Sequence, residues 1–194
     1  LIKDIRHHRE LIDTLDIWNS NLARYGSLII KNRINYIEKL RDISKKIYFG
    51  ISSGKESFDI KYKTCSYDEL SVADIELILL EEYKKKLDDD IKCGFTNTGP
   101  HRDDIDIYVD KKLARSYASR GQQRSCVLSL KLAESEILKL SIGEKPVILL
   151  DDVMSELDNK RQDYILNSIK DFQVFITCCE PSAVLRLSKG KKFE

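Results

Sequence analysis

SRGQQR at 119–124 opens the stretch that decides the fold, which continues through VILLDD at 147–152 to SELD at 155–158. The apolar run inside it, at 147–150, is entered through Pro146 and ends in two adjacent acids. A short apolar run of this kind is typical of a buried strand in a covered α/β sheet, and such sheets bind ligands at the carboxyl ends of their strands. Neighbouring side chains on a strand point to opposite faces, so we expect Asp151 and Asp152 to serve different groups.

A helix is expected over Gln122–Leu140, and its N-terminus is a candidate anion site. Ser119 lies where a hydroxyl can cap exposed backbone N–H groups, and Gly121 leaves room for a phosphate beside the backbone. The partial positive charge of a helix N-terminus favours an anion there. An ordinary capped and packed helix has the same local pattern, but the acidic strand that follows favours the anion site. Gly143 is expected to end the helix.

The order of these parts is more specific than any one of them. A Ser and a Gly before a helix, then an apolar strand ending in acids, then S-x-L-D, resembles the C-terminal half of an ABC-type ATPase head. SRGQQR would be its signature motif, VILLDD its Walker B strand and SELD its D-loop. With GPHRDD at 99–104, this wording resembles the RecF recombination-mediator family closely over nearly the whole chain. The resemblance implies an α/β fold in which a helical arm (lobe II-like) precedes the C-terminal part of the head.

The resemblance also implies a role for each motif. ATP would lie between two heads, and the signature residues of one head would contact the triphosphate bound by the other: Ser119, Arg120, Gly121, Gln122 and Gln123. Asp151 would reach the Mg²⁺ shell, while Asp152 would polarise the attacking water. Ser155 and Asp158 would belong to the D-loop. Thr177 stands where related heads carry a histidine that senses the terminal phosphate.

The whole protein implied by the resemblance is a slow DNA-dependent ATPase of DNA repair, replication and recombination, including the SOS response. ATP binding would drive homodimerisation at gapped DNA, hydrolysis would drive release, and the RecO and RecR proteins would be partners.

No phosphate loop is present in the sequence. The stretch most similar to a phosphate loop is Gly54-Lys55. There Glu56 replaces the Ser or Thr that the motif requires, and no strand precedes it. Because the chain also begins at Leu1 within a helical pattern, we interpret it as a C-terminal fragment that lacks the Walker A region and is inactive alone.

Composition narrows the class of protein. The 194 residues suffice for one good core or two small ones, and the net charge of +1 does not by itself indicate nucleic acid. Five cysteines without a C-x-x-C pair are a poor disulfide framework, which favours a reducing cytoplasm. No run approaches the ~20 apolar residues of a membrane span, and no signal peptide opens the chain.

Residues 1 to about 48 are expected to be helical and to pair as an antiparallel arm. One apolar series is Leu11, Leu15, Trp18, Leu22, Tyr25 and Ile29, and a second is Ile34, Ile37, Leu40, Ile43 and Ile47. Up to Lys46 this region has ten Lys and Arg against six Asp and Glu. Such an excess is usually a solvated face; the alternative is contact with DNA phosphates, through Arg24, Lys31 and Arg33.

We expect an arm domain over 1–93 and a head portion over 94–194. A loop is expected at 50–55, strands at 58–62, 104–110, 114–117 and 173–177, a hairpin turn at Lys111-Lys112, and helices at 67–87 and 160–169. His101 and Arg102 are open to two interpretations, as locally paired side chains or as part of a coupling loop.

Three other interpretations remain open. An SMC or Rad50 head shares the motif order, but its halves are separated by a much longer coiled coil. A transporter ATPase would show a signature nearer LSGGQ and a histidine after the second strand. The third is a non-catalytic DNA-binding or protein-interaction module, in which Asp151 and Asp152 are surface acids.

Overall fold

The computed structural model describes residues 1–5, 7–63, 67, 69–154 and 157–178. It divides into two compact units: the first unit comprises Leu1–Glu38 and Lys61–Ile105, and the second comprises Lys39–Ile60 and Asp106–Glu194. The chain thus enters each unit twice. The division into domains at residue 94 stays a prediction.

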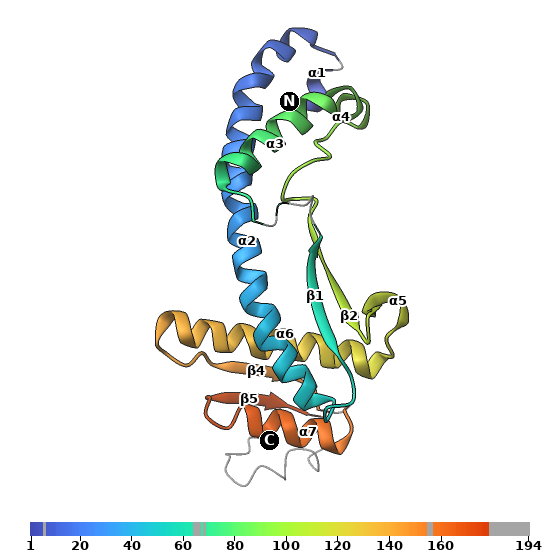
Figure 1. Cartoon of the computed structure of the whole chain (residues 1–194), viewed down its shortest axis with the longest axis vertical. Coiled ribbons are helices and arrows are strands. Elements are labelled where there is room, and N and C mark those ends of the chain that lie inside the picture. The colour runs from blue at the N-terminus through green and yellow to red at the C-terminus, as the bar shows by residue number, and fades with distance from the viewer. Residues whose placement is uncertain (6, 64–66, 68, 155–156, 179–194) are drawn as a thin grey trace. The chain divides into compact units, whose positions relative to one another are not determined.

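The chain combines helices and strands in a mixed fold, as expected (Figure 1). The helices are α1 (Ile2–Ile5), a 3-10 turn η1 (Arg9–Thr14), α2 (Leu15–Ile51), α3 (Val72–Lys85), α4 (Leu87–Cys93), α5 (Ala114–Tyr117), α6 (Arg120–Ile142) and α7 (Asn159–Ser168). The strands are β1 (Phe58–Lys63), β2 (Asp104–Val109), β3 (Lys112–Leu113), β4 (Ile148–Asp151) and β5 (Val174–Thr177). Among the described residues, no helix combines the length and the apolar character that crossing a membrane requires.

Helix α2 is one uninterrupted helix of 37 residues, so the predicted antiparallel pairing within residues 1–48 is wrong. The second predicted apolar series is confirmed by buried Ile34, Ile37 and Leu40. The first series is wrong beyond Leu15, because Trp18 is 56% exposed and the rest of that series after it is also exposed.

The face of α2 that is buried in the first unit carries small residues instead. Ala23 and Ser27 are fully buried there, and a Cβ atom added to Gly26 would lie 3.2 Å from Leu79 of α3. The core of this unit is formed by Ala23, Ile30, Ile34, Tyr67, Ile75, Leu79 and Tyr83. Close approach of α3 therefore decides which face of α2 is buried, and it places the larger aromatic side chains in solvent.

The hairpin β2–β3 differs from the prediction. Tyr108 pairs with Leu113 and Val109 with Lys112 in antiparallel register, so the turn is Asp110-Lys111. Both turn residues have positive φ, 48° and 64°, the pattern of a type I′ turn that matches strand twist. The strand predicted at 114–117 is wrong, since these residues form α5.

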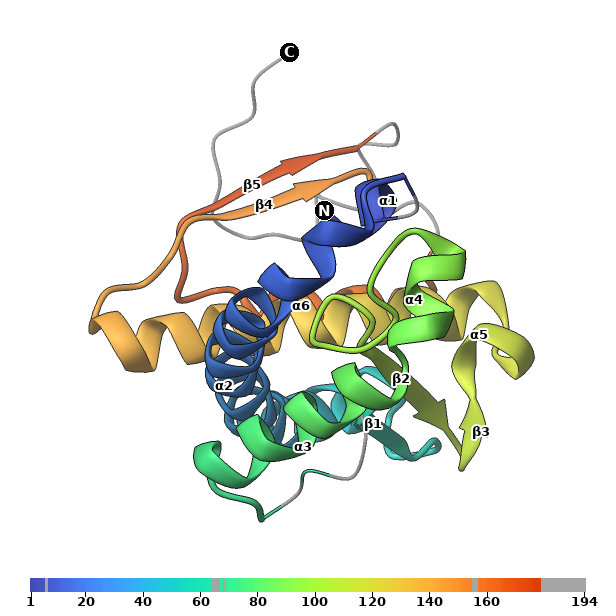
Figure 2. The same ribbon diagram turned by 90° about the horizontal axis from the view of Figure 1, so that it is seen from above.

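In the second unit, β4 and β5 pair in parallel, with Leu149 opposite Phe175 and Asp151 opposite Thr177 (Figures 1 and 2). Ile148 and Leu150 face a core that α6, α7 and the end of α2 complete: Ile51, Leu128, Leu132, Met154, Leu157, Ile165, Leu166 and Ile169. Leu149 is 73% exposed, so the prediction of a strand buried on both faces is wrong for this chain. Helices α6 and α7 contribute to the same core as Ile148 and Leu150. Because side chains of a strand alternate between faces, Leu149 points away from that core.

Candidate functional site

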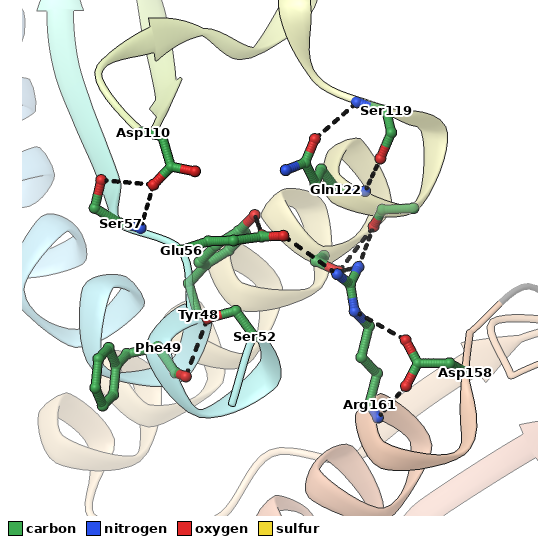
Figure 3. Close-up of polar contacts among 12 residues, drawn as sticks. Tyr48, Phe49, Ser52, Glu56, Ser57, Asp110, Ser119, Gln122, Asp158 and Arg161 are labelled. Carbon is green, nitrogen blue, oxygen red and sulfur yellow. Dashed lines mark hydrogen bonds and ion pairs between the residues drawn. The ribbon is translucent and has the colours of Figure 1, made fainter. Parts of the chain in front are cut away.

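The N-terminus of α6 is closed by a reciprocal capping box. The backbone N–H of Gln122 donates to Ser119 Oγ at 3.2 Å, and the backbone N–H of Ser119 donates to Gln122 Oε1 at 2.9 Å (Figure 3). The predicted cap is confirmed, as is the end of the helix at Gly143, whose φ is 78°. The N–H groups of Arg120 and Gly121 occupy the first two helical positions, where helix geometry provides no intrahelical acceptor. These two donors can receive an anion.

The first two turns of α6 present a cationic hollow. Arg120, Gln123, Arg124 and Val127 line an open cavity of about 470 Å³. Gln123 donates from its side-chain amide to the carbonyl of Ala118 at 3.2 Å, so its position is set by the chain just before the helix. Arg124 lies in the SRGQQR stretch, but sequence reasoning gave it no role; the one-turn spacing from Arg120 was the available signal.

Packing against the described residues does not require a glycine at position 121. Among them, a Cβ atom added there would meet only Arg161 Nη1, at 3.6 Å, which is an ordinary van der Waals contact. Its φ is not positive either. A glycine inside a helix costs about 0.5–1 kcal/mol relative to alanine. A close approach by a group from outside the chain would explain the residue.

The carboxyl ends of β4 and β5 bring Asp151, Asp152 and Thr177 together. The Thr177 hydroxyl donates to Asp151 Oδ1 at 2.5 Å, and the backbone N–H of Asp152 donates to Thr177 Oγ1 at 3.0 Å and to Thr177 O at 3.2 Å. Asp152 has a left-handed φ of 47°, so it leaves the strand geometry and the simple alternation of faces does not describe it. Both carboxylates are exposed.

This end of the sheet suits a hard cation. Mg²⁺ prefers oxygen ligands and is often held by one or two carboxylates together with substrate phosphates, and Asp151 offers such an oxygen with the Thr177 hydroxyl beside it. In the described part of the chain, no three His, Cys, Asp or Glu side chains gather as a metal cluster. Asp151 would therefore hold Mg²⁺ together with water or with phosphate oxygens supplied by a nucleotide. The roles of Asp151, Asp152 and Thr177 remain predictions.

The predicted D-loop is described in part. Asp158 caps α7, with Oδ1 accepting the N–H groups of Lys160 and Arg161, each at 3.1 Å. Ser155 lies outside the described residues.

Arg161 was missed by sequence reasoning and lies at the centre of the polar network in Figure 3. Its guanidinium donates to Gly121 O at 2.9 Å and to Ser125 Oγ at 2.7 Å on α6. It also forms ion pairs with Asp158, at 3.2 Å, and with Glu56, at 3.6 Å. Of these partners, Gly121, Ser125 and Glu56 are remote in sequence, and a local pattern could indicate only Asp158, three residues before Arg161.

The segment that contains Gly50 and Gly54 does not form a phosphate loop. A helix ends at Ile51 and a strand begins at Phe58, the reverse of the strand-to-helix order that a phosphate loop requires. Ser53 and Gly54 both have positive φ, and the predicted turn is confirmed.

The predicted DNA-contacting residues do not share one face. Arg24 and Lys31 are seven residues apart on α2, about two turns, whereas Arg33 lies on the opposite side. Arg33 donates to the carbonyl of Pro100, within GPHRDD. The structure therefore groups Arg24 with Lys31 and gives Arg33 a contact within the first unit.

The GPHRDD loop is held by local contacts in the first unit. His101 Nε2 lies 2.9 Å from Thr96 O, and Arg102 lies over the ring of Phe95 at 4.5 Å. The Tyr62 hydroxyl donates to Asp103 at 2.5 Å; burial and this carboxylate raise the pKa of Tyr62 to about 12. These contacts support the interpretation of His101 and Arg102 as locally paired side chains.

Comparison with known proteins identifies close relatives. The chain is 48% identical over 167 residues to the DNA replication and repair protein RecF of Clostridium kluyveri, covering 86% of this chain and 45% of that protein. It is 45% identical over 205 residues to the protein of the same name from Clostridium perfringens strain SM101, covering 96% of this chain and 56% of that protein. No protein-family model matches the chain.

Solved structures agree with the sequence relatives. The recombination mediator protein RecF-ATPrS in the RecFOR pathway is 42% identical and superposes with a TM-score of 0.83, covering 94% of this chain and 49% of that one. The RecF-ATP structure of the same pathway gives 41% identity and a TM-score of 0.79 with the same coverage. The chain thus spans about half the length of the relatives it matches. By sequence and by fold, it belongs to the RecF family.

Proposed function

We propose that this chain supplies the nucleotide-sandwiching portion of an ATP-dependent recombination mediator. The observation that carries the proposal is the capped N-terminus of α6, where the N–H groups of Arg120 and Gly121 have no intrahelical acceptor and lie beside a cationic hollow. Two of the matching solved structures are RecF-ATPrS and RecF-ATP, which supports ATP as the ligand. The phosphate loop for that ATP would come from the part of the relatives that this chain does not match.

Two regions of the second unit would have different roles: the N-terminus of α6 and the carboxyl ends of β4 and β5. Ser119, Arg120, Gly121, Gln122 and Gln123 would contact the triphosphate held by a second copy of the protein. Asp151 would help to hold Mg²⁺, which neutralises phosphate charge when bound, while Asp152 would orient and deprotonate water. Thr177 would set the position of the Asp151 carboxylate through the hydrogen bond between them. Binding of ATP would thereby join two copies, and hydrolysis would separate them.

The biological setting follows from the relatives. They are DNA replication and repair proteins, and the solved structures belong to the RecFOR pathway, which supports DNA as a ligand and the RecO and RecR proteins as partners. We propose gapped DNA as the place where the ATP-bound homodimer acts. Exposed Arg24 and the partly buried Lys31 would supply sequence-independent phosphate contacts.

Ser119→Arg in the full-length protein tests this proposal. The long cation would fill the anion site while leaving the nucleotide cradle of the same copy untouched. ATP binding by the monomer should stay within about two-fold of wild type in calorimetry, whereas ATP-driven dimerisation in sedimentation velocity should be lost. Equal loss of monomer binding and dimerisation would mean that Ser119 serves only as a helix cap.

A further inference from the structure

Arg161 joins three segments of the second unit that are far apart in sequence. Its side chain is 17% exposed, and its partners come from α6 (Gly121 and Ser125), from the cap of α7 (Asp158) and from the loop after α2 (Glu56). A guanidinium is a rigid planar fork with five donors, so satisfying several acceptors at once fixes its orientation. The three segments are therefore held in one relative arrangement by one side chain.

The charge of Arg161 is placed against the helix dipole. A cation is unfavourable near a helix N-terminus, and Arg161 contacts the first turn of α6. Asp158 and Glu56 offset that cost as ion-pair partners. An apolar side chain of similar volume would often hold such a junction as stably as a half-buried ion network does. The presence of the Arg161 ion network beside the candidate anion site therefore favours a role for Arg161 beyond stability.

The Glu56 carboxylate contacts Arg161 through one oxygen and is held by Tyr48 through the other. The hydroxyl of Tyr48 donates to Glu56 Oε2 at 2.6 Å. Tyr48 is fully buried and its ring stacks on Phe58 at 4.8 Å. Burial and the Glu56 carboxylate raise the pKa of Tyr48, so its hydroxyl remains a donor. Through Glu56, the position of Arg161 is tied to the C-terminal end of α2.

The bond to Gly121 acts on the anion site directly. Gly121 O belongs to the peptide unit between Gly121 and Gln122, whose N–H is the one that Ser119 accepts. Arg161 and Ser119 thus hold the two sides of the same peptide unit, one through its oxygen and one through its nitrogen. The orientation of the first turn, and with it the direction of the Arg120 and Gly121 N–H groups, depends on both bonds.

We propose that Arg161 is a positioning residue that locks the nucleotide-contacting turn of α6 to the D-loop cap Asp158, with Glu56 setting its orientation. The inference rests on the proposed function. It adds that Arg161 aligns the first turn of α6 with the cap of α7, both of which the same copy would contribute to the dimer. A shift of one element would be transmitted to the other through the guanidinium.

The test compares Arg161→Met, Arg161→Lys and Glu56→Gln in the full-length protein, with Lys170→Met as the matched loss of an exposed cation. Arg161→Met should leave monomer ATP affinity within about two-fold and raise the ATP concentration for half-maximal dimerisation by about ten-fold or more, the scale of a lost charge-assisted hydrogen bond. Arg161→Lys keeps the charge but not the planar fork of donors. Its ATP concentration for half-maximal dimerisation should lie between those of wild type and Arg161→Met. Glu56→Gln keeps an acceptor for Tyr48 and should give a smaller defect. Dimerisation of Arg161→Met equal to that of Lys170→Met would overturn the proposal.

Amide hydrogen exchange without nucleotide tests the same lock independently of ATP. Arg161→Met should speed exchange in peptides covering both 119–125 and 157–161, and Arg161→Lys should partly restore protection in both. Faster exchange in the α7 peptide alone would overturn the proposal, even in a variant too unstable for the dimerisation assay. A wild-type protein that fails to dimerise with ATP would instead count against the proposed function, while the exchange result still decides the role of Arg161.

Discussion

Thr177 on β5 donates its hydroxyl to the carboxylate of Asp151 on the neighbouring strand β4, at 2.5 Å. The two residues are direct partners in the parallel register. The same hydroxyl oxygen accepts the backbone N–H of Asp152. One threonine therefore orients both the carboxylate proposed for Mg²⁺ and the backbone of the carboxylate proposed for water.

Thr177→Val should separate this role from packing, because valine matches threonine in shape and lacks the hydroxyl. In the full-length protein, we expect the Mg²⁺ concentration that supports half-maximal ATP binding to rise several-fold, as Asp151 loses its donor. Thr177→Ser keeps the hydroxyl and should stay near wild type. An unchanged Mg²⁺ dependence for Thr177→Val would show that Asp151 needs no such partner.

Gly121→Ala should have opposite effects on the fold and on dimerisation. Because a Cβ atom at Gly121 would make an ordinary contact with Arg161 Nη1 and the backbone there is helical, alanine should stabilise the protein by up to about 1 kcal/mol in urea unfolding. The added methyl group would crowd an incoming phosphate and weaken ATP-driven dimerisation. Dimerisation at the wild-type level would mean that no ligand approaches this glycine.

Asp59 gives the second unit a pH-dependent contribution to stability. Arg41 donates to both of its oxygens, at 2.6 and 2.8 Å, and Lys45 lies 3.0 Å away. The hydrogen bond from Arg41, with smaller effects from Lys45, holds the pKa of Asp59 well below its usual range, although partial burial opposes the shift. A carboxylate with a lowered folded-state pKa stabilises the fold above its unfolded pKa of about 3.9, and that stability is lost as the pH falls further, through the folded value. In urea unfolding, wild type should lose stability from about pH 4 downward, and Asp59→Asn should be less stable at pH 7 with a shallower acid dependence. Parallel curves for the two proteins would contradict this.

Arg24 and Lys31 should contribute to DNA binding as a pair. Neutralising both to Gln should reduce the slope of log affinity against log salt by about two, since each lost phosphate contact releases about one counterion fewer. Arg33→Gln should instead lower thermal stability, because Arg33 is bonded to the carbonyl of Pro100. Salt titrations on gapped DNA by fluorescence anisotropy measure the slopes. An unchanged slope for the double variant would place the DNA site elsewhere.

The parts of the fold predicted correctly depend on local chemistry. Ser119 and Gln122 are three residues apart and form their capping box without help from the rest of the chain, and Gly143 likewise ends α6 by its own backbone freedom. The strands predicted from the short apolar runs at 147–150 and 173–177 are present as β4 and β5, although their parallel pairing was not predicted.

Two of the failures, the buried face of α2 and the role of Arg161, have a different cause, which is distance along the chain. Trp18 and Ala23 are both compatible with a helix, and only the approach of α3 at Gly26 decides that the small side of α2 is buried. Arg161 has a partner 40 residues away in Gly121 and one 105 residues away in Glu56. No periodicity or spacing rule connects such positions, so the polar junction is formed only in the folded chain.

The central claim is that α6 of one copy completes the nucleotide site of another, and mixing two inactive variants tests it most directly. Ser119→Arg should be unable to complete its partner's site, and Asp152→Asn should hydrolyse ATP on the order of 10²-fold more slowly. In a mixed dimer, the Ser119→Arg copy keeps its own Asp152 and receives an intact α6 from the Asp152→Asn copy. The full-length variants, mixed in equal amounts, should therefore hydrolyse ATP well above the sum of their separate rates. A mixture no faster than that sum, with mixed dimers present by mass photometry of a tagged copy, would contradict the claim.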